Sequence, residues 1–154
     1  ERLPGHDAFA ILRPTSPFRT GKTIKRAWQR FQDNQPADSL RAVESVKQHP
    51  GKMWVVRNDR LLPILPWELI QPGVKTPWHS SPTQALPNVY IQNASLEIAW
   101  VKTVKETGTI AGTNVVPFYT ENLEGLDINT ETDWLFAEEL MKGIKRLMES
   151  EGGQ

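Results

Sequence analysis

The chain has 154 residues, and its eighteen basic side chains balance eighteen acidic ones, so it carries no formal net charge. That balance argues against a nucleic acid or an anionic membrane as the partner, because both select for basic surfaces. The absence of cysteine excludes disulfides, thiolate metal sites and cysteine nucleophiles. The chain has no run of eighteen apolar residues, so we expect a soluble protein. The lack of cysteine fits a cytoplasmic location, and the length suits one domain over residues 1–154.

Residues 8–46 predict a strand, a helix and a second strand. The short apolar run 8–12 is typical of a strand buried on both faces of a parallel sheet. Apolar residues then recur at steps of three and four over 24–31, which indicates a helix. Alternation over 39–46 predicts the second strand. Together these elements form a βαβ unit, whose crossover we expect to be right-handed.

The region 48–88 has a different texture. Residues 53–62 predict a hairpin around an Asn-Asp turn, and six prolines after it exclude long regular elements. We therefore expect an irregular insertion rich in proline and aromatic residues. Such an insertion is either a binding loop or an oligomer interface, or else a surface excursion fixed by Trp67 and Trp78.

Regular structure returns after the insertion. Alternation over 89–100 and the run 115–119 predict two further strands. An amphipathic helix follows over 134–147, with Glu131 and Asp133 in its first turn, where the helix dipole favours acidic residues. The whole pattern predicts the α/β class.

The most informative segment is 12–20, at the carboxyl end of the first predicted strand, where open α/β sheets bind ligands. Arg13 and Arg19 suit bidentate binding of phosphate or carboxylate, and the Ser16 hydroxyl adds a polar contact. The alternative is a proline-stiffened loop whose Thr20 caps the helix.

Four segments, in order, resemble motifs of one family, the acylneuraminate cytidylyltransferases or CMP-sialic acid synthetases. Residues 12–19 resemble its Leu-Gln/Arg-Pro-Thr-Ser-Pro-Leu-Arg motif, and 49–54 resemble its His-Pro-x-Lys segment. Residues 84–93 are similar to its Arg-Gln-x-Leu-Pro-x-x-Tyr/Phe-x-x-Asn segment, and 124–133 to its Asp-Ile-Asp-Thr-x-x-Asp signature.

The resemblance implies a three-layer, Rossmann-like nucleotidyltransferase sheet and a reaction of CTP with a nine-carbon acidic sugar. The anomeric hydroxyl attacks the α-phosphorus while Mg²⁺ neutralises phosphate charge; a 3-deoxy-manno-octulosonate or pseudaminic-type enzyme would differ only in the sugar. By resemblance, the nucleotide or sugar contacts are Arg13, Ser16, Arg19, Lys52, Gln84, Gln92 and Asn93, and the metal ligands are Asp127 and Asn129.

Several of these residues have a structural alternative. The alternative role for Lys52 is a solvated lysine beside the hairpin. The alternative for Asn93 is a side chain that satisfies a backbone turn. Asp127 precedes a helix, so it is also a candidate cap. We interpret His49 as structural, because the three histidines have no metal-ligand spacing.

The chain also departs from the family pattern. It lacks the Ala-Arg-x-x-Ser-Lys-Gly loop that wraps the triphosphate, so the resemblance covers a sheet truncated at its N-terminus. Asn129 stands at the second aspartate of Asp-Ile-Asp, and Thr83 stands at the arginine suited to the sugar carboxylate. We therefore expect a synthetase that is inactive or incomplete as this chain; the alternative is a non-catalytic remnant that serves in binding or oligomerisation.

A missing neighbour strand would leave the apolar run 8–12 unpaired along one edge, which invites pairing with another chain. Family members dimerise through the excursion that corresponds to 48–88. We therefore expect a homo-oligomer that forms through the strand edge, through the insertion, or through both.

Overall fold

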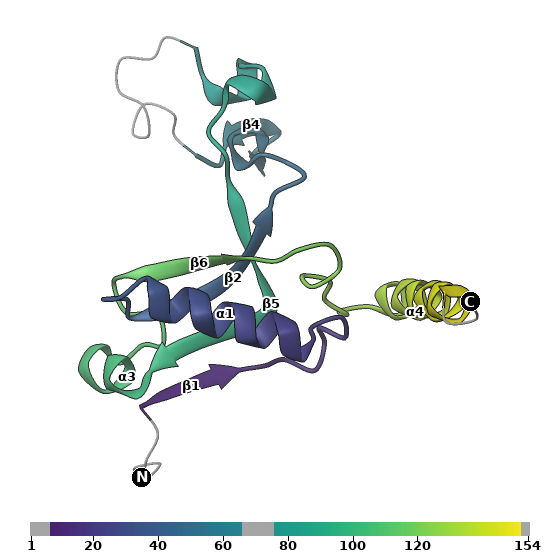
Figure 1. The fold of residues 1–154 in the computed structure, drawn as a ribbon. Coiled ribbons are helices and arrows are strands. Elements are labelled where there is room, and N and C mark those ends of the chain that lie inside the picture. Colours follow the sequence, from purple (N-terminus) through teal and green to yellow (C-terminus); the bar gives the residue numbers. More distant parts are fainter. Residues whose placement is uncertain (1–6, 66–75, 152–154) are drawn as a thin grey trace. The chain divides into compact units, whose positions relative to one another are not determined.

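The computed structural model describes residues 7–65 and 76–151, and the chain divides into two compact units (Figure 1). One unit comprises Glu1–Glu44 with Gln92–Gln154, and the other comprises Ser45–Ile91. The second unit contains the insertion predicted over 48–88. Within the described residues, no helix is both long enough and apolar enough to cross a membrane.

The elements confirm the predicted α/β class. Four strands form one mixed sheet in the order β1-β5-β2-β6. All four were predicted from the sequence, as were the helices before β2 and after β6. The elements are β1 (Ala8–Ile11), α1 (Gly21–Asp33), β2 (Ser39–Ser45), β5 (Tyr90–Trp100), α3 (Val101–Thr107), β6 (Val115–Tyr119) and α4 (Glu131–Glu151).

The strand directions place the carboxyl ends of three strands at the same end of the sheet. β1 runs antiparallel to β5, whereas β2 runs parallel to β6. Hydrogen bonds from Val46 N to Val89 O, 3.2 Å, and from Trp100 N to Asp38 O, 3.4 Å, flank the β2–β5 pair, so these strands are antiparallel. β1, β2 and β6 therefore share a direction.

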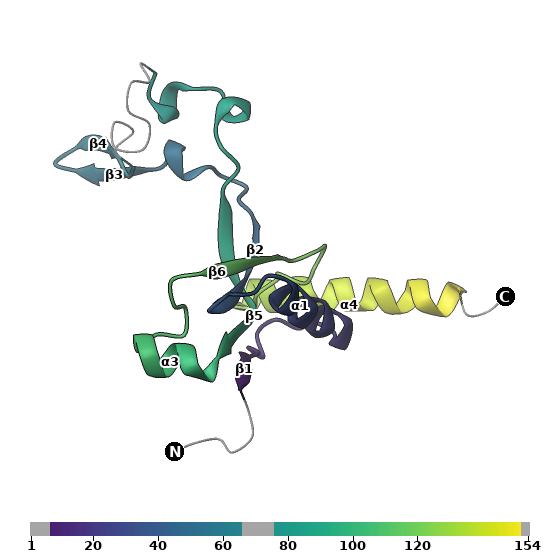
Figure 2. The same ribbon diagram turned by 60° about the vertical axis from the view of Figure 1, so that its left-hand side comes forward.

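The first strand differs from its prediction. The run 8–12 predicts a strand buried on both faces of a parallel sheet, with one edge unpaired. β1 is the outermost strand of the described sheet, but it pairs antiparallel with β5 (Figure 2), and Ala10 is exposed. An apolar run alone does not distinguish parallel from antiparallel neighbours, because it specifies burial and not the direction of the adjacent strands.

The core lies between α1 and one face of the sheet (Figure 1). Side chains alternate along a strand, so every second residue of β2, β5 and β6 points to α1. The Phe31 and Trp100 rings are 4.9 Å apart. The buried residues of this core are Ala27, Phe31, Ala37, Leu40, Ala42, Leu96, Ile98, Val116 and Phe118.

The second unit contains the predicted hairpin, formed by β3 (Trp54–Arg57) and β4 (Arg60–Pro63). Asn58 and Asp59 have φ values of 50° and 56°. Two successive residues with positive φ define the type I′ turn, whose twist matches that of the flanking strands. The proline-rich remainder forms short helical turns at Pro50–Lys52, Trp78–Ser80 and Thr83–Ala85, while Trp67 lies outside the described residues.

His49 has the structural role that the sequence indicates. Its buried ring accepts a hydrogen bond at Nδ1 from Gly51 N, 3.0 Å, and donates from Nε2 to Pro87 O, 3.1 Å. Its edge packs against Trp78, which is also buried. A side chain at Gly51 would lie 2.9 Å from Trp78, so the close approach of these two turns requires glycine.

Candidate anion-binding site

Two loops meet at the end of the sheet where the strands β1 and β6 reach their carboxyl ends. Residues 12–20 follow β1, and residues 120–130 follow β6. Ile128 N donates to Thr15 O at 2.9 Å, which joins the two loops. The predicted segments 12–19 and 124–133 are therefore neighbours in space, at the edge of the sheet where α/β proteins commonly bind ligands.

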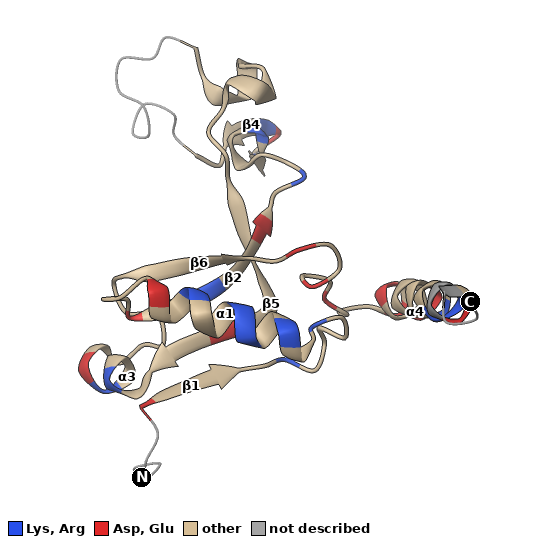
Figure 3. Cartoon of the chain, viewed as in Figure 1, with Lys and Arg blue, Asp and Glu red and all other residues tan. Residues whose placement is uncertain are grey.

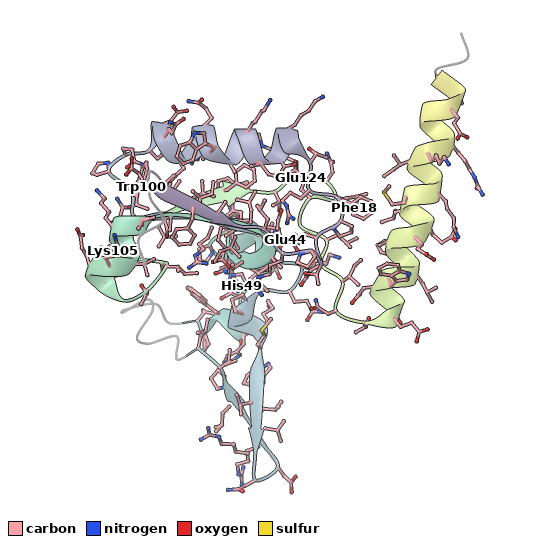
Figure 4. All side chains as sticks on the ribbon, turned by 90° about the horizontal axis from the view of Figure 1, so that it is seen from below. Phe18, Glu44, His49, Trp100, Lys105 and Glu124 are labelled. Atoms are coloured by element: carbon pink, nitrogen blue, oxygen red, sulfur yellow. The ribbon has the colours of Figure 1, made fainter. Side chains whose placement is uncertain are left out.

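Helix α1 holds the second loop through Glu124 (Figure 4). The Glu124 carboxylate accepts from Thr23 Oγ1 at 2.7 Å and from Arg26 Nη2 at 2.6 Å. Burial raises the pKa of Glu124, but hydrogen bonds from Glu121 N–H, Thr23 and Arg26 hold it below its ordinary value overall. Glu124 is thus an ionised anchor of the loop.

Asn93 fastens β5 to the same loop. Its Nδ2 donates to Thr120 Oγ1 at 2.9 Å and to Glu44 Oε2 at 3.4 Å, while its Oδ1 accepts from Ser95 N at 3.2 Å. The buried Gly125 lies against these side chains and leaves no room for a Cβ. The bond to Ser95 N is the backbone interaction that the sequence offered as the alternative to a sugar contact.

The two arginines of the first loop differ in their surroundings. Arg19 Nη1 donates to Arg13 O at 3.0 Å and also to Ser95 O, which ties the loop to β5. Burial lowers the pKa of Arg19. The Arg13 side chain is 57% exposed and lies 3.5 Å from Glu97. Arg13 is therefore the cation that a ligand can reach, and Arg19 shapes the loop around it.

Glu97 and Arg41 complete this cluster, and the sequence reading missed both. Glu97, on β5, is buried, and it forms ion pairs with Arg13 and with Arg41 of β2. Burial lowers the pKa of Arg41, and the positive charge of Arg13 lowers it further. Two cations around one anion leave a net charge of +1. Arg41 and Glu97 occupy polar positions in the alternating strands predicted over 39–46 and 89–100, and this alternation did not indicate that the two side chains meet.

Buried polar atoms mark the place where the loops meet. Among the described residues, Ser16 Oγ, Ser95 Oγ and Asp127 Oδ1 are buried without a hydrogen-bond partner. Leaving such an atom unpaired costs about 1–3 kcal/mol. Ser16 and Asp127 directly neighbour Thr15 and Ile128, which join the loops. These unpaired hydroxyl and carboxylate oxygens lie on the two joined loops, the first of which also carries the exposed Arg13, and they are potential partners for a polar ligand.

Asp127 does not cap α4, so that alternative is wrong. Asp133 N donates to Thr130 Oγ1 at 3.2 Å, and Thr130 N donates to Asp133 Oδ2 at 2.8 Å, so these two residues cap the helix. The Thr130 hydroxyl and the Asn129 and Thr130 N–H groups lower the pKa of Asp133. Asp127 has no part in this cap and stays a candidate residue of the anion-binding site.

The residues at Asp127 fit a magnesium ion that depends on ligand phosphates. Asn129 Nδ2 donates to Asp127 Oδ2 at 2.9 Å, so Asn129 orients the carboxylate whose Oδ1 has no partner. In the described part of the chain, no three His, Cys, Asp or Glu side chains group as a metal site. Mg²⁺ is commonly held by one or two carboxylates together with substrate phosphates and water, so Asp127 would be the protein ligand of such an ion.

The remaining predicted contacts are Lys52, Gln84 and Gln92. Lys52 and Gln84 belong to the second unit. Lys52 is exposed, and its Nζ donates to Ser81 O at 2.7 Å and to His79 O at 3.4 Å, so this lysine links two turns at the surface of the second unit. Gln84 is exposed on the turn Thr83–Ala85, and Gln92 is exposed on β5.

No known protein family matches the chain, and no curated protein sequence is significantly similar to it. The family resemblance therefore rests on the four motifs and on the residues that they bring to the site.

Proposed function

We propose that this chain is a CMP-sugar synthetase-like protein, and that its first unit binds the phosphate or carboxylate groups of a nucleotide or acidic sugar. The supporting observation is that Ser16 Oγ and Asp127 Oδ1, both buried and unpaired, adjoin loops that touch each other beside the exposed Arg13. Two of the four motifs are brought together there. The proposal includes a Rossmann-like nucleotidyltransferase sheet as the fold.

The ligand set follows from the chemistry of the site. Arg13 binds an anionic group, and the Ser16 hydroxyl supplies a hydrogen bond to one of its oxygens. Bound Mg²⁺ would neutralise phosphate charge, with Asp127 as the carboxylate ligand and Asn129 as the residue that orients it. CTP and a nine-carbon acidic sugar are the ligands that we propose by resemblance.

We further propose that this chain alone does not complete cytidylyl transfer. Asn129 removes one negative charge from the metal site, and Thr83 cannot bind a sugar carboxylate as an arginine would. Positioning and electrostatics provide most of the catalysis in phosphoryl transfer, so the loss of charged groups at two positions weakens the reaction more than the binding.

A second candidate function, assembly without catalysis, is favoured by the hairpin. Val56 and Leu61 are 67% and 60% exposed, and Trp54, Val55 and Leu62 are also exposed. A two-stranded hairpin is marginal by itself in water, and a contiguous exposed apolar patch marks an interaction surface. We propose that the hairpin contributes to a homo-oligomer.

A calorimetric titration with CMP-sialic acid and Mg²⁺, repeated with CTP and Mg²⁺, tests the proposed function. We expect saturable binding that Arg13→Ala weakens about tenfold or more, because it removes a charged hydrogen bond. Arg57→Ala removes the same charge from the hairpin and should leave the affinity unchanged. Absence of binding to the folded protein would refute the ligand site and leave assembly as the function.

A further inference from the structure

Within the described residues, the outer edge of β1 is apolar and no other strand covers it. In the described part of the sheet β1 is the outermost strand, paired along one edge with β5. Its four residues, Ala8–Ile11, carry no charge and include no proline. Natural proteins usually protect such an edge with charged residues, proline or a bulge. This edge has the properties of a strand that pairs with another strand.

An apolar groove lies beside that edge, on the face covered by α1. It is lined by Ala8, Phe9, Ala10, Ile24, Trp28 and Ile98. Trp28 is 36% exposed, and Leu12, immediately after β1, is 40% exposed. Leu12 is one residue beyond β1, and because side chains alternate along a strand, an extension of β1 through Leu12 would place this side chain on the face of Ala8 and Ala10. The edge thus offers both a groove and an apolar side chain of a size to fill one.

We propose that β1 pairs antiparallel with β1 of a second copy of this chain, around a two-fold axis at Ala10. Directly opposite residues of an antiparallel pair share a face of the sheet. The register centred on Ala10 places Ala8 opposite Leu12 of the second copy and Phe9 opposite its Ile11. Each Leu12 then enters the groove of the other copy, and the interface is isologous.

Charge complementarity selects this register. Centring on Ala10 places the exposed Asp7 opposite Arg13 of the second copy, and the two-fold axis repeats this pair. Registers centred on Phe9 or on Ile11 also preserve the faces, but they place Asp7 opposite Ile11 or Thr15, without a charged partner. Opposite charges across a strand pair are favourable. The pairing joins two four-stranded sheets into one continuous sheet.

A cysteine cross-link tests the register directly, because the chain has no cysteine of its own. In the proposed dimer Ala10 lies directly opposite Ala10 of the second copy. The two Cα atoms are about 4.5–5.5 Å apart, which is within the range for a disulfide. Ala10→Cys should therefore form a covalent dimer rapidly on mild oxidation. Lys105→Cys, at an exposed position of α3, measures random collision. Cross-linking no faster than that control would overturn the proposal.

A charge exchange provides a second test that does not depend on the cysteine variant. Asp7→Arg and Arg13→Asp each place like charges opposite each other in their own dimers and should lower the molar mass in light scattering. Mixing the two variants restores both opposite-charge pairs, so native mass spectrometry should detect the heterodimer. An unchanged mass for Asp7→Arg, or a mixture without heterodimer, would overturn the proposal. An assembly that only Leu61→Asp disrupts would assign the contact to the hairpin and overturn it as well.

Discussion

Glu97 is the buried carboxylate between two arginines, and it sets the electrostatics of the candidate site. Arg13 and Arg41 approach it from a loop and from β2, and they differ in exposure: the Arg41 side chain is 14% exposed and that of Arg13 is 57% exposed. Removal of one partner from a buried ion pair leaves an uncompensated charge, whereas an exposed pair contributes little.

We therefore predict that Glu97→Gln lowers the free energy of unfolding by about 3 kcal/mol. Arg13→Ala should lower it by less than about 1 kcal/mol, because water already screens that side chain. Urea denaturation of both variants measures the difference. Equal losses for the two variants would contradict the assignment of Glu97 as the partner of a buried Arg41.

A second prediction for a single residue concerns Gly125. A Cβ there would lie 2.6 Å from Asn93 Nδ2 and 2.9 Å from Thr120 Oγ1. Gly125→Ala should therefore break the hydrogen bond between these two side chains and lower the unfolding free energy by about 1–3 kcal/mol. Gly21→Ala is the matched control, since nothing lies within 4 Å of its Cβ position; in the first turn of α1 it should be neutral or slightly stabilising. Similar effects for both substitutions would be inconsistent with this packing.

The sequence predicts single residues well where their role is local. Thr20 caps α1 through hydrogen bonds with Thr23, as the alternative interpretation of that loop proposed. His49 is structural, and both follow from adjacent residues. The roles of Glu97 and Arg41 depend on which strands are neighbours, and Asn93 depends on a loop that lies 27 residues away. Contacts of this kind cannot be read from local spacing.

At the scale of elements, Asp38 joins the start of β2 to the loop before β6. Its Oδ2 accepts from Thr113 N at 2.8 Å and from Asn114 N at 2.9 Å. These backbone N–H groups lower the pKa of Asp38 below its ordinary value of 3.8. A carboxyl group whose pKa is lowered in the folded state contributes stability above the ordinary value, and that stability is lost as the pH falls below it.

We predict that Asp38→Asn is less stable than the wild type at pH 7 and that the difference shrinks as the pH falls below 3.8. Urea midpoints measured across this range test the prediction. Asp59→Asn removes the same charge from the hairpin turn and serves as the control. A stability difference for Asp38→Asn that persists undiminished at pH 3 would show that the ionised carboxylate is not what holds the loop.

Periodicity predicted the strands and the two long helices, because alternation and helical spacing are visible in sequence. It missed α3, whose seven residues contain Val101, Thr103 and Val104 and are too short to show a helical period. It also predicted an apolar face for α4, and the helix is present, yet Trp134, Leu135 and Phe136 are more than half exposed. Amphipathicity shows that a face is apolar, but it does not show what covers that face.

At the scale of the whole molecule, the exposed hairpin predicts a homo-oligomer. We expect the wild type to be larger than a monomer in light scattering at micromolar concentration. Leu61→Asp should lower the molar mass, because it places a charge in the apolar surface of β4. Lys105→Asp on α3 is the control for an added acidic side chain. A monodisperse wild-type monomer would contradict this prediction.

The fold class and the unpaired edge along residues 8–12 were expected from the sequence, whereas the antiparallel pairing of β1 with β5 and the division into two units were not. These last two features depend on contacts between distant segments. The motifs predicted that residues 12–19 and 124–133 act together, and the hydrogen bond from Ile128 to Thr15 brings them into contact. Lys52 and Gln84 lie in the other unit, so a role for them in the same site stays a prediction.

The most direct test of the central claim is an NMR titration of the isotopically labelled chain with CMP-sialic acid and Mg²⁺. We expect the amide resonances of Ser16 and Asp127 to shift together and to saturate at one ligand concentration, because both residues line one site. Resonances of the hairpin tip at Arg57 and Arg60 should stay unchanged. Shifts confined to the second unit, or no shift at millimolar ligand, would contradict the claim that these two loops form a ligand-binding site.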